Sequence, residues 1–450
     1  MTEHSGTFRS LRVFNYRVWA AGAIVSNVGT WMQRTAQDWL VLTELTDHSA
    51  TAVGVVLSLQ FAPLVLLLPL TGLAADPLDR RRLLIATQAA LGLQALGLGL
   101  LTVTGAVQLW QVYGFALMLG CVTAFDSAAR QTFVSDLVTG PDLSNAVALN
   151  STSFNVARLI GPAVAGLLIG TVGTGWVFLI NAATFGTVQV SLSLMRRHEL
   201  QPRTPGRRHP GDLVDGFRYV WNRPDLLVIL LMLFLVGTFA LNFPIFLSTM
   251  AVQVFHSGSG SFGLLTSAAA VGSVIGALLS ARRAAPRVAL LPIGAAVFGS
   301  GLGLAAVMPT YGLFALVLVL VGVSGQTFTT TANGAVQLAT DPVMRGRVIA
   351  ILLAVMMGGT PIGGPIIGWV TDAYGPRWGL GVGAAGGLAA ALVGVAHLIV
   401  HRRLRLRRHG WQFRFSLETG PVPDELTGGT PGRNGRGVGT APPENGGRPD

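Results

Sequence analysis

The chain has 450 residues, of which 51% are hydrophobic and 11% are charged, and its mean hydropathy is +0.57. Soluble domains carry about 25% charged residues, so this composition excludes a soluble globular protein. It predicts an all-α polytopic membrane protein, because a chain this apolar suits helices surrounded by lipid. The formal net charge of +11 comes from arginine, since the chain contains no lysine.

The reactive residue types give no sign of a cofactor. Cys121 is the single cysteine and lies in an apolar run, which excludes a disulfide framework. No group of His and Cys residues has the spacing of metal ligands, so we expect no metal and no cofactor. A phosphate-binding loop would need a lysine, and no His or acid pair follows the motif order of a lipid-cleaving enzyme. The sequence therefore argues against a primary pump and against an enzyme.

Twelve segments are long and apolar enough to cross a membrane as helices, which takes about 20 residues. The first six lie near residues 18–42, 51–75, 83–104, 109–132, 145–169 and 174–195. The second six lie near residues 225–247, 261–281, 288–307, 311–333, 346–370 and 377–400. The first segment has no small-residue cleavage site, so we expect it to remain as a membrane helix and not to be removed as a signal peptide.

A polar stripe follows the first segment. Arg34 and Asp38 are four residues apart and therefore share a helix face. Asn27 and Gln37 extend the stripe, which indicates a water-filled cavity. Asp38 is a candidate for the carboxylate that carries a coupled proton. The alternative is that Asp38 and Arg34 lie at the outer membrane interface and are solvated there.

A short charged stretch separates the second and third segments and contains Gly72, Asp76, Arg80 and Arg81. This spacing resembles the loop signature of the major facilitator superfamily. The variant is similar to that of the branch containing the enterobactin exporter and the transmembrane secretion effectors. The resemblance implies the major facilitator fold, with twelve transmembrane helices in two six-helix bundles, and transport by alternating access.

The same resemblance implies a gate at this loop. Asp76 would face the start of the eleventh helix, near residues 345–348, where the positive end of a helix dipole adds to two arginines. That contact would hold the cytoplasmic side shut in the outward-open state. The alternative is that the arginines of the loop only keep it in the cytoplasm.

Asp126 and Arg130 are four residues apart near the end of the fourth segment. We interpret them as a salt bridge at the inner gate, with a proton relay through Asp126 as the alternative. The second half of the chain has few acids inside its apolar segments. It offers Asn242, Gln326 and Asn333 as polar candidates for the substrate cavity.

Arg158 is the charge that lies deepest in an apolar run. It follows the start of the fifth segment by about twelve residues, or ~18 Å along a helix, and a charge at the membrane centre costs ~2.5 kcal/mol or more. One interpretation is a cavity site for an anionic or polar group of the substrate, or a charge whose partner changes between states. The other is a fixed bridge to an acid on another helix.

Gly161, Pro162 and Gly166 in the fifth segment are echoed by Gly364 and Pro365 in the eleventh. This pattern resembles the fifth-helix signature of drug:proton antiporters, which implies export. Small residues let two helix backbones approach closely, and Pro removes one helix hydrogen bond. The alternative is that these residues serve packing and kinking alone.

The repeat predicts two bundles, at residues 1–195 and 225–401, joined by a cytoplasmic linker at 196–224. Apolar residues at helical spacing within the linker predict a surface amphipathic helix, with a plain linker as the alternative. The basic tail at 402–450 becomes rich in Gly and Pro, and we expect it to be disordered.

The arginines predict the orientation. With the N-terminus in the cytoplasm, nearly all of them fall on cytoplasmic segments, and the exceptions are Arg34, Arg158 and Arg377. We therefore expect a multi-pass protein of the plasma membrane with both termini in the cytoplasm. The basic charge then faces anionic lipid, so we expect no binding of nucleic acid.

Together these patterns predict a secondary active exporter of a small amphipathic molecule, such as a drug, a siderophore or a secondary metabolite. We expect proton antiport with alternating access. The expected partners are a small-molecule substrate, protons and membrane lipid, and we expect a monomer. An importer or facilitator on the same fold, and a membrane sensor that transports nothing, are the alternatives.

Overall fold

A computed structural model describes residues 7–67, 79–201, 212–282, 288–402, 404–409 and 412–417. Gly72 and Asp76 of the predicted gating loop lie outside the described residues. The helices of the first part are α1 (Phe14–Trp39), α2 (Ala50–Leu66), α4 (Arg80–Val103), α5 (Leu109–Leu137), α6 (Gly140–Val172) and α7 (Thr174–Leu194). Those that follow are α8 (Asp212–Trp221), α9 (Pro224–Leu235), α10 (Phe243–Thr249), α11 (Ser259–Ala281), α12 (Leu291–Ala306), α13 (Tyr311–Ala339), α14 (Arg345–Tyr374) and α15 (Pro376–Arg402).

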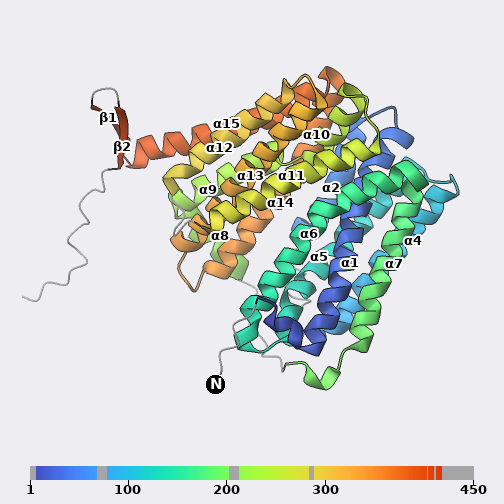
Figure 1. Ribbon diagram of the computed structural model, residues 1–450. Helices are drawn as coiled ribbons and strands as arrows, with labels where there is room; N and C mark the ends of the chain where they lie inside the picture. Colours follow the sequence, from blue (N-terminus) through green and yellow to red (C-terminus); the bar gives the residue numbers. More distant parts are fainter. Residues whose placement is uncertain are drawn as a thin grey trace, which may run out of the picture. The chain divides into compact units, whose positions relative to one another are not determined.

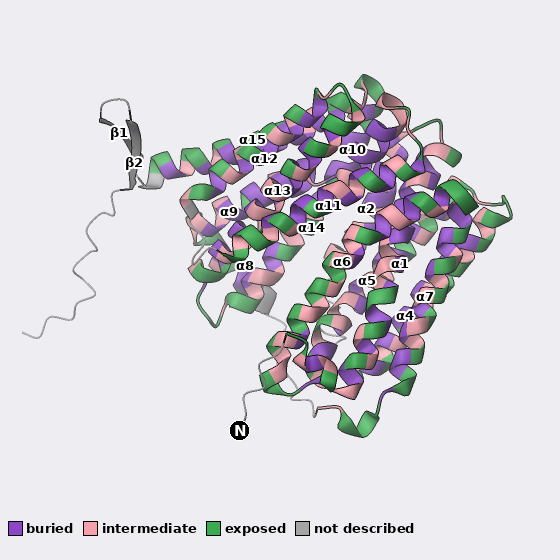
Figure 2. Ribbon diagram, viewed as in Figure 1, coloured by how far each residue is buried: buried purple, intermediate pink, exposed green. Residues whose placement is uncertain are grey.

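The helices are long and apolar. Nine helical stretches within the described ranges have the length and hydropathy to cross a membrane, and α2 and α12 are shorter apolar helices. Helix α1 spans 26 residues but carries the polar stripe. Many large hydrophobic side chains point outward, among them Leu93, Leu316 and Leu392, while Figure 2 shows buried residues along the faces where helices meet. The chain is a multi-pass membrane protein whose outer surface suits lipid.

The helices pack in two groups. In the first, α1 packs on α6 and α7, α4 on α5 and α7, and α2 on α5. In the second, α13 packs on α11 and α12, and α14 packs on α9. The groups meet along two seams, where α2 packs on α14 and α6 packs on α11. Figure 1 shows the groups converging near α10 and diverging toward α8.

The segment predicted as one helix near 225–247 is interrupted. A π-helical turn, Val236–Ala240, follows α9, and the helical hydrogen bonding breaks at Leu241 and Asn242 before α10 begins. Pro244 lies in the first turn of α10, and its ring has no N–H to donate to the preceding turn. Helical structure then continues through Met250–Val254, beyond the predicted end at residue 247.

The internal repeat extends to the backbone. Helix α1 continues into a π-helix at Leu40–Glu44, and α10 continues into another at Met250–Val254. Each is followed by a histidine with positive φ, His48 at 60° and His256 at 47°. A non-glycine residue rarely adopts this conformation, and it occurs four residues after the first of these π-helices and two residues after the other.

Residues Met1–Leu398 form one compact unit and Ile399–Asp450 a second. In the second unit, β1 (Leu404–His409) pairs antiparallel with β2 (Gln412–Leu417), with Leu404 opposite Leu417. The sequence predicted disorder over residues 402–450 and did not predict this hairpin. Its strands alternate apolar and polar residues, as in Leu-Arg-Leu-Arg and Phe-Arg-Phe-Ser, which is the period of a β-strand.

Helix α8 occupies the predicted linker. Its Val214, Phe217 and Trp221 side chains are exposed, as expected for a helix with an unpartnered apolar face. The Tyr219 hydroxyl donates to Asp341 at 3.0 Å, and Arg347 of α14 pairs with Asp215 at 3.3 Å. These contacts hold α8 beside the start of α14.

Candidate substrate cavity and its polar network

A cavity of about 190 Å³ lies between the two groups of helices. It is lined from the first group by α1, α2 and α6, and from the second by α10, α11 and α14. Large apolar side chains make much of its wall. They include Leu57, Phe61, Leu247 and Phe262. The charged residues of the wall are Arg34, Asp38 and Arg158, so the structure brings together three residues that the sequence singled out.

Aromatic rings hold both arginines of the cavity. The guanidinium carbon of Arg34 lies 5.5 Å from the ring centre of Trp31 and 5.5 Å from that of Phe61. The guanidinium carbon of Arg158 lies 5.8 Å from the ring centre of Trp31. Neither arginine forms an ion pair within the part of the chain that the structure describes, and Arg34 Nε is buried without a hydrogen-bond partner. Cation–π contact stabilises a guanidinium but leaves its N–H groups able to bind a polar ligand.

Asp38 lies one helical turn after Arg34. Its side chain is buried, at 5% exposure, and it lines the cavity. Among the described residues it accepts no hydrogen bond and forms no ion pair within 4.0 Å. A buried carboxylate normally has such partners, so Asp38 differs from the other membrane acid of the first group.

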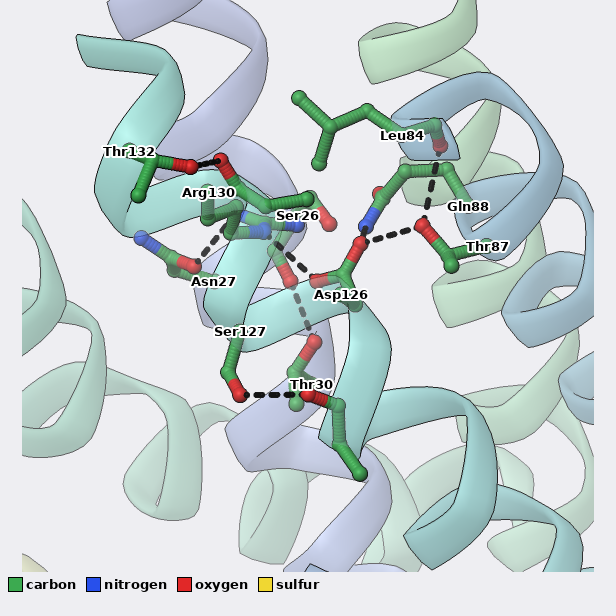
Figure 3. A network of polar contacts seen from close by, with 12 residues as sticks. Ser26, Asn27, Thr30, Leu84, Thr87, Gln88, Asp126, Ser127, Arg130 and Thr132 are labelled. Atoms are coloured by element: carbon green, nitrogen blue, oxygen red, sulfur yellow. Dashed lines mark hydrogen bonds and ion pairs between the residues drawn. The ribbon is translucent and has the colours of Figure 1, made fainter. Parts of the chain in front are cut away.

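That other acid, Asp126, has hydrogen bonds to both of its carboxylate oxygens (Figure 3). Its Oδ1 accepts from Thr87 Oγ1 at 2.7 Å and from Gln88 Nε2 at 2.7 Å, and its Oδ2 accepts from Arg130 Nε at 2.9 Å. Arg130 also donates to Asn27 Oδ1 at 3.2 Å. The network ties α1, α4 and α5 together, and none of these residues lines the cavity.

The remaining polar candidates lie away from the cavity wall. Asn27 belongs to the Asp126 network, and Gln37 is fully buried, with both side-chain polar atoms lacking a hydrogen-bond partner among the described residues. Asn242 donates to the Thr238 carbonyl at 2.7 Å. Gln326 donates to Thr330 at 3.1 Å, and Asn333 accepts from Gln337 at 2.6 Å. The last two pairs lie within α13.

The glycines of the predicted antiporter signature lie at helix contacts. A side chain at Gly161 would meet the Trp31 Cβ at 2.6 Å, and one at Gly166 would meet the backbone of α11. Pro162 lies inside α6 without ending it. On the other seam, Gly364 and Pro365 lie against Gly54 of α2. These residues allow the close approach of helices expected from small side chains. The absence of a side chain at Gly161 also leaves room for Trp31 in its observed position.

The arginines of the charged loop pack within the first group. Arg80 pairs with Asp136 at 2.6 Å, and Arg81 donates to the Leu192 carbonyl at 2.9 and 2.5 Å. Asp79 caps α4 by accepting from the backbone N–H of Arg81 and of Arg82. This explains why helix α4 begins at the end of the charged stretch.

Three features of the site were not predicted. Trp31 was not singled out, although its spacing from Arg34 and its aromatic ring were signals. The break at Leu241 was signalled only by Pro244. Asp372, which was not singled out from the sequence, accepts four hydrogen bonds from residues at the start of α2, described below. Pairing of α2 with α14 cannot be read from local sequence.

Comparison with known proteins identifies the family. The sequence profile of the family described as transmembrane secretion effector matches residues 5–407. The chain is 24% identical to the staphyloferrin A transporter of Staphylococcus aureus over 385 residues, which covers 84% of this chain and 94% of that protein. It is 26% identical to the enterobactin exporter of Shigella boydii over 377 residues, covering 81% of this chain and 87% of that protein.

Solved structures of transporters share the fold. A bacterial homologue of the human lysosomal transporter Spinster, in an inward-facing and unoccupied conformation, matches with a TM-score of 0.66 at 16% identity, covering 86% of this chain and 95% of that one. The nucleoside transporter NupG matches with a TM-score of 0.66 at 14% identity, covering 85% and 98%. The chain therefore belongs to the transmembrane secretion effectors of the major facilitator superfamily, a family of transporters, as the spacing of its charged loop predicted.

Proposed function

We propose that this protein is a secondary active exporter of a small amphipathic molecule, driven by proton antiport through alternating access. The observation that carries the proposal is the cavity between the two helix groups, with Asp38, Arg34 and Arg158 on its wall. In alternating access, two bundles rock around such a site. Broken helices commonly form these sites, and the wall includes Leu241 from the break before α10 and Phe243 from the first turn of α10.

The proposed architecture is twelve transmembrane helices in two six-helix bundles, at residues 1–195 and 225–401, with the linker at 196–224 between them. The grouping of helix contacts supports it. Both termini would lie in the cytoplasm, because that orientation keeps nearly all arginines inside. The end near α8 would then face the cytoplasm, and the end near Asp372 would face outward.

Each charged residue of the cavity has a proposed role. Asp38 carries the coupled proton, since it is a buried acid on the cavity wall with no hydrogen bond among the described residues. Arg158 and Arg34 hold a polar or anionic group of the substrate. Asp126 keeps the first bundle together, because Thr87, Gln88 and Arg130 all bond to its carboxylate (Figure 3).

The substrate class takes support from the relatives. The staphyloferrin A transporter and the enterobactin exporter are each named for a siderophore. A siderophore or a metabolite with a polar group and an apolar body would suit the arginines and the apolar wall. Inward proton movement along a membrane potential supplies ~2.3 kcal/mol per charge per 100 mV, enough for more than roughly tenfold accumulation.

The test is accumulation of dyes, drugs and siderophores in an efflux-deficient bacterial host, with and without a protonophore. We expect the protein to lower accumulation and the protonophore to reverse this. Asp38→Asn should lose the protonophore-sensitive export. Asp47→Asn is the matched control, because it makes the same change at an exposed residue outside the cavity.

Two outcomes would contradict the proposal. Export by Asp38→Asn that stays protonophore-sensitive would remove Asp38 from coupling. If the wild-type protein reaches the membrane and changes the accumulation of no compound, including the siderophores, the export function is wrong.

A further inference from the structure

Asp372 lies in the last turn of α14, at the end of the molecule where the π-helices Leu40–Glu44 and Met250–Val254 finish. Its Oδ1 accepts from the backbone N–H of Ala50 at 2.6 Å. Its Oδ2 accepts from the backbone N–H of Thr51 at 3.0 Å, from Thr51 Oγ1 at 2.6 Å and from Ser49 Oγ at 3.1 Å. We call this set of four hydrogen bonds the Asp372 cap.

The cap joins the two helix groups at the start of α2. Ser49 is the N-cap of α2, and its hydroxyl also accepts from the backbone N–H of Ala52 at 3.2 Å. The first N–H groups of a helix have no partner within the helix, and the helix start carries partial positive charge. Asp372 therefore provides, from the other group, the acceptors and the negative charge that this helix start requires.

The position of Asp372 in its own helix is unfavourable. The end of a helix carries partial negative charge, so an acid there is repelled. The favourable electrostatic energy of the Asp372 carboxylate therefore comes from the start of α2 and not from α14. The carboxylate is also exposed, so water can replace its partners, and the contact can open and close without stranding a buried charge.

Below the cap, α2 and α14 remain in close contact. Gly54 lies against Gly364, and a side chain at Gly368 would meet the Ala50 carbonyl at 2.6 Å. One turn further along, Ser58 Oγ donates to the Pro361 carbonyl at 2.8 Å. The contacting residues recur every three or four positions on both helices, so α2 and α14 touch along one continuous face that ends at Asp372.

Other hydrogen bonds between the groups, within the described residues, reinforce this end. Gln253 Nε2 donates to the His48 carbonyl at 2.8 Å, and Ser259 Oγ donates to the Gly166 carbonyl at 3.0 Å. These bonds involve uncharged side chains, each with one acceptor. The Asp372 cap is the charged element among them.

We propose that the Asp372 cap is the latch that holds this end of the transporter closed. The inference rests on the proposed alternating access, in which the groups must separate here to release substrate. Opening breaks the four hydrogen bonds of Asp372, and closing restores them. The strength of the cap thus sets the ratio of the closed to the open form at this end.

The test measures that separation directly by pulsed electron spin resonance on the full chain in liposomes. Spin labels at Val172→Cys on α6 and Pro309→Cys before α13, in a Cys121→Ser background, report the distance between the groups at this end. Asp372→Asn leaves one oxygen without the charge. We expect about a tenfold rise in the ratio of long to short distances, which corresponds to ~1.4 kcal/mol.

Two further variants make the result specific. Thr51→Val removes one donor to Asp372 and keeps the carboxylate, so it should raise the same ratio by less, and it serves if Asp372→Asn does not fold. Asp47→Asn makes the same charge change at an exposed residue near the cap, and it should leave the distances unchanged.

The outcomes separate this inference from the export proposal. Unchanged distances in both folded Asp372→Asn and Thr51→Val, or an equal shift in Asp47→Asn, would overturn the latch. A transporter that exports normally and shows unchanged distances fails only the latch. The expected shift in a protein that exports nothing would support the latch and count against the proposed function.

Discussion

At the residue scale, the cavity differs from the network beside it in how its charges are partnered. Arg130 has Asp126 at 2.9 Å and Asn27 at 3.2 Å. Arg158, by contrast, forms a cation–π contact, with its guanidinium carbon 5.8 Å from the ring centre of Trp31. A buried charge with full partners is structural, whereas one left with free donors suits a ligand. The two arginines therefore have different expected phenotypes.

Replacement of Arg158 should weaken binding of a substrate with an anionic group. Hydrogen bonds to charged groups contribute ~1.5–3 kcal/mol, so Arg158→Ala should reduce affinity about 10- to 100-fold in calorimetric titrations of purified protein. Arg158→Lys should retain part of the affinity, because lysine keeps the charge but lacks the planar fork. Arg377→Gln, which removes the same charge at an exposed site outside the cavity, is the control. Normal binding by the Ala variant would make Arg158 structural.

Gly161 should not tolerate a side chain. A Cβ there would meet the Trp31 Cβ at 2.6 Å and the Val28 carbonyl at 3.1 Å, and overpacking of this kind costs ~1–3 kcal/mol. Gly161→Ala should therefore lower the melting temperature and disturb the cavity. Gly186→Ala should be neutral or slightly stabilising, because an added Cβ there meets no described neighbour within 4 Å outside its own helical turn and Ala favours helix more than Gly. Equal melting curves for the two variants would contradict the close contact.

At the element scale, the Asp126 network connects three helices: the carboxylate joins α5 to α4, and its partner Arg130 joins α5 to α1. Both oxygens are used as acceptors, by Thr87, Gln88 and Arg130. An asparagine offers a single oxygen, so its NH₂ group would have to face a donor. The network is thus specific for a carboxylate, although its residues come from separate parts of the chain.

Asp126→Asn and Asp38→Asn should differ in thermal stability. Breaking a buried ion pair costs ~3–5 kcal/mol, so Asp126→Asn should unfold at a clearly lower temperature in purified form. Asp38→Asn should melt close to wild type, because it removes no described hydrogen bond. Export and thermal stability measured on the same preparations decide this. A large loss of stability in Asp38→Asn would indicate a partner that the proposed role does not include.

At the scale of the whole molecule, α2 and α14 connect the two ends. The observed contact places Asp372, from the end of α14, at the start of α2. The predicted gate would place Asp76, which follows α2, at the start of α14 near residues 345–348. The two contacts would use the same pair of helices in reciprocal fashion, one at each end. They would favour opposite states of the transporter.

Loss of the two acids should therefore shift the conformational equilibrium in opposite directions. Asp76→Asn should slow transport and favour the form that is open near α8, whereas Asp372→Asn should favour the form that is open at the other end. The double variant should lie between them. Spin-label distances at both ends provide the measurement. A shift in the same direction for both single variants would disprove the reciprocal arrangement.

The sequence by itself determined the membrane class, the family and most helices. Apolar runs of membrane length with few charges predict membrane helices, because each helix satisfies its backbone hydrogen bonds within itself. These are local properties, readable along the chain. The sequence likewise singled out Arg34, Asp38 and Arg158, because a charge in an apolar run is conspicuous wherever the chain folds.

Only the tertiary structure decided which of the polar residues meet. Asn27 and Asp38 belong to the same predicted stripe, yet one joins the Asp126 network and the other lines the cavity. Gln326 and Asn333 bond within α13 instead of reaching the cavity. The partner of Asp372 is more than 300 residues away in the chain. Side-chain partners depend on the pairing of helices across seams, and that pairing follows from packing of the whole molecule rather than from neighbours in sequence.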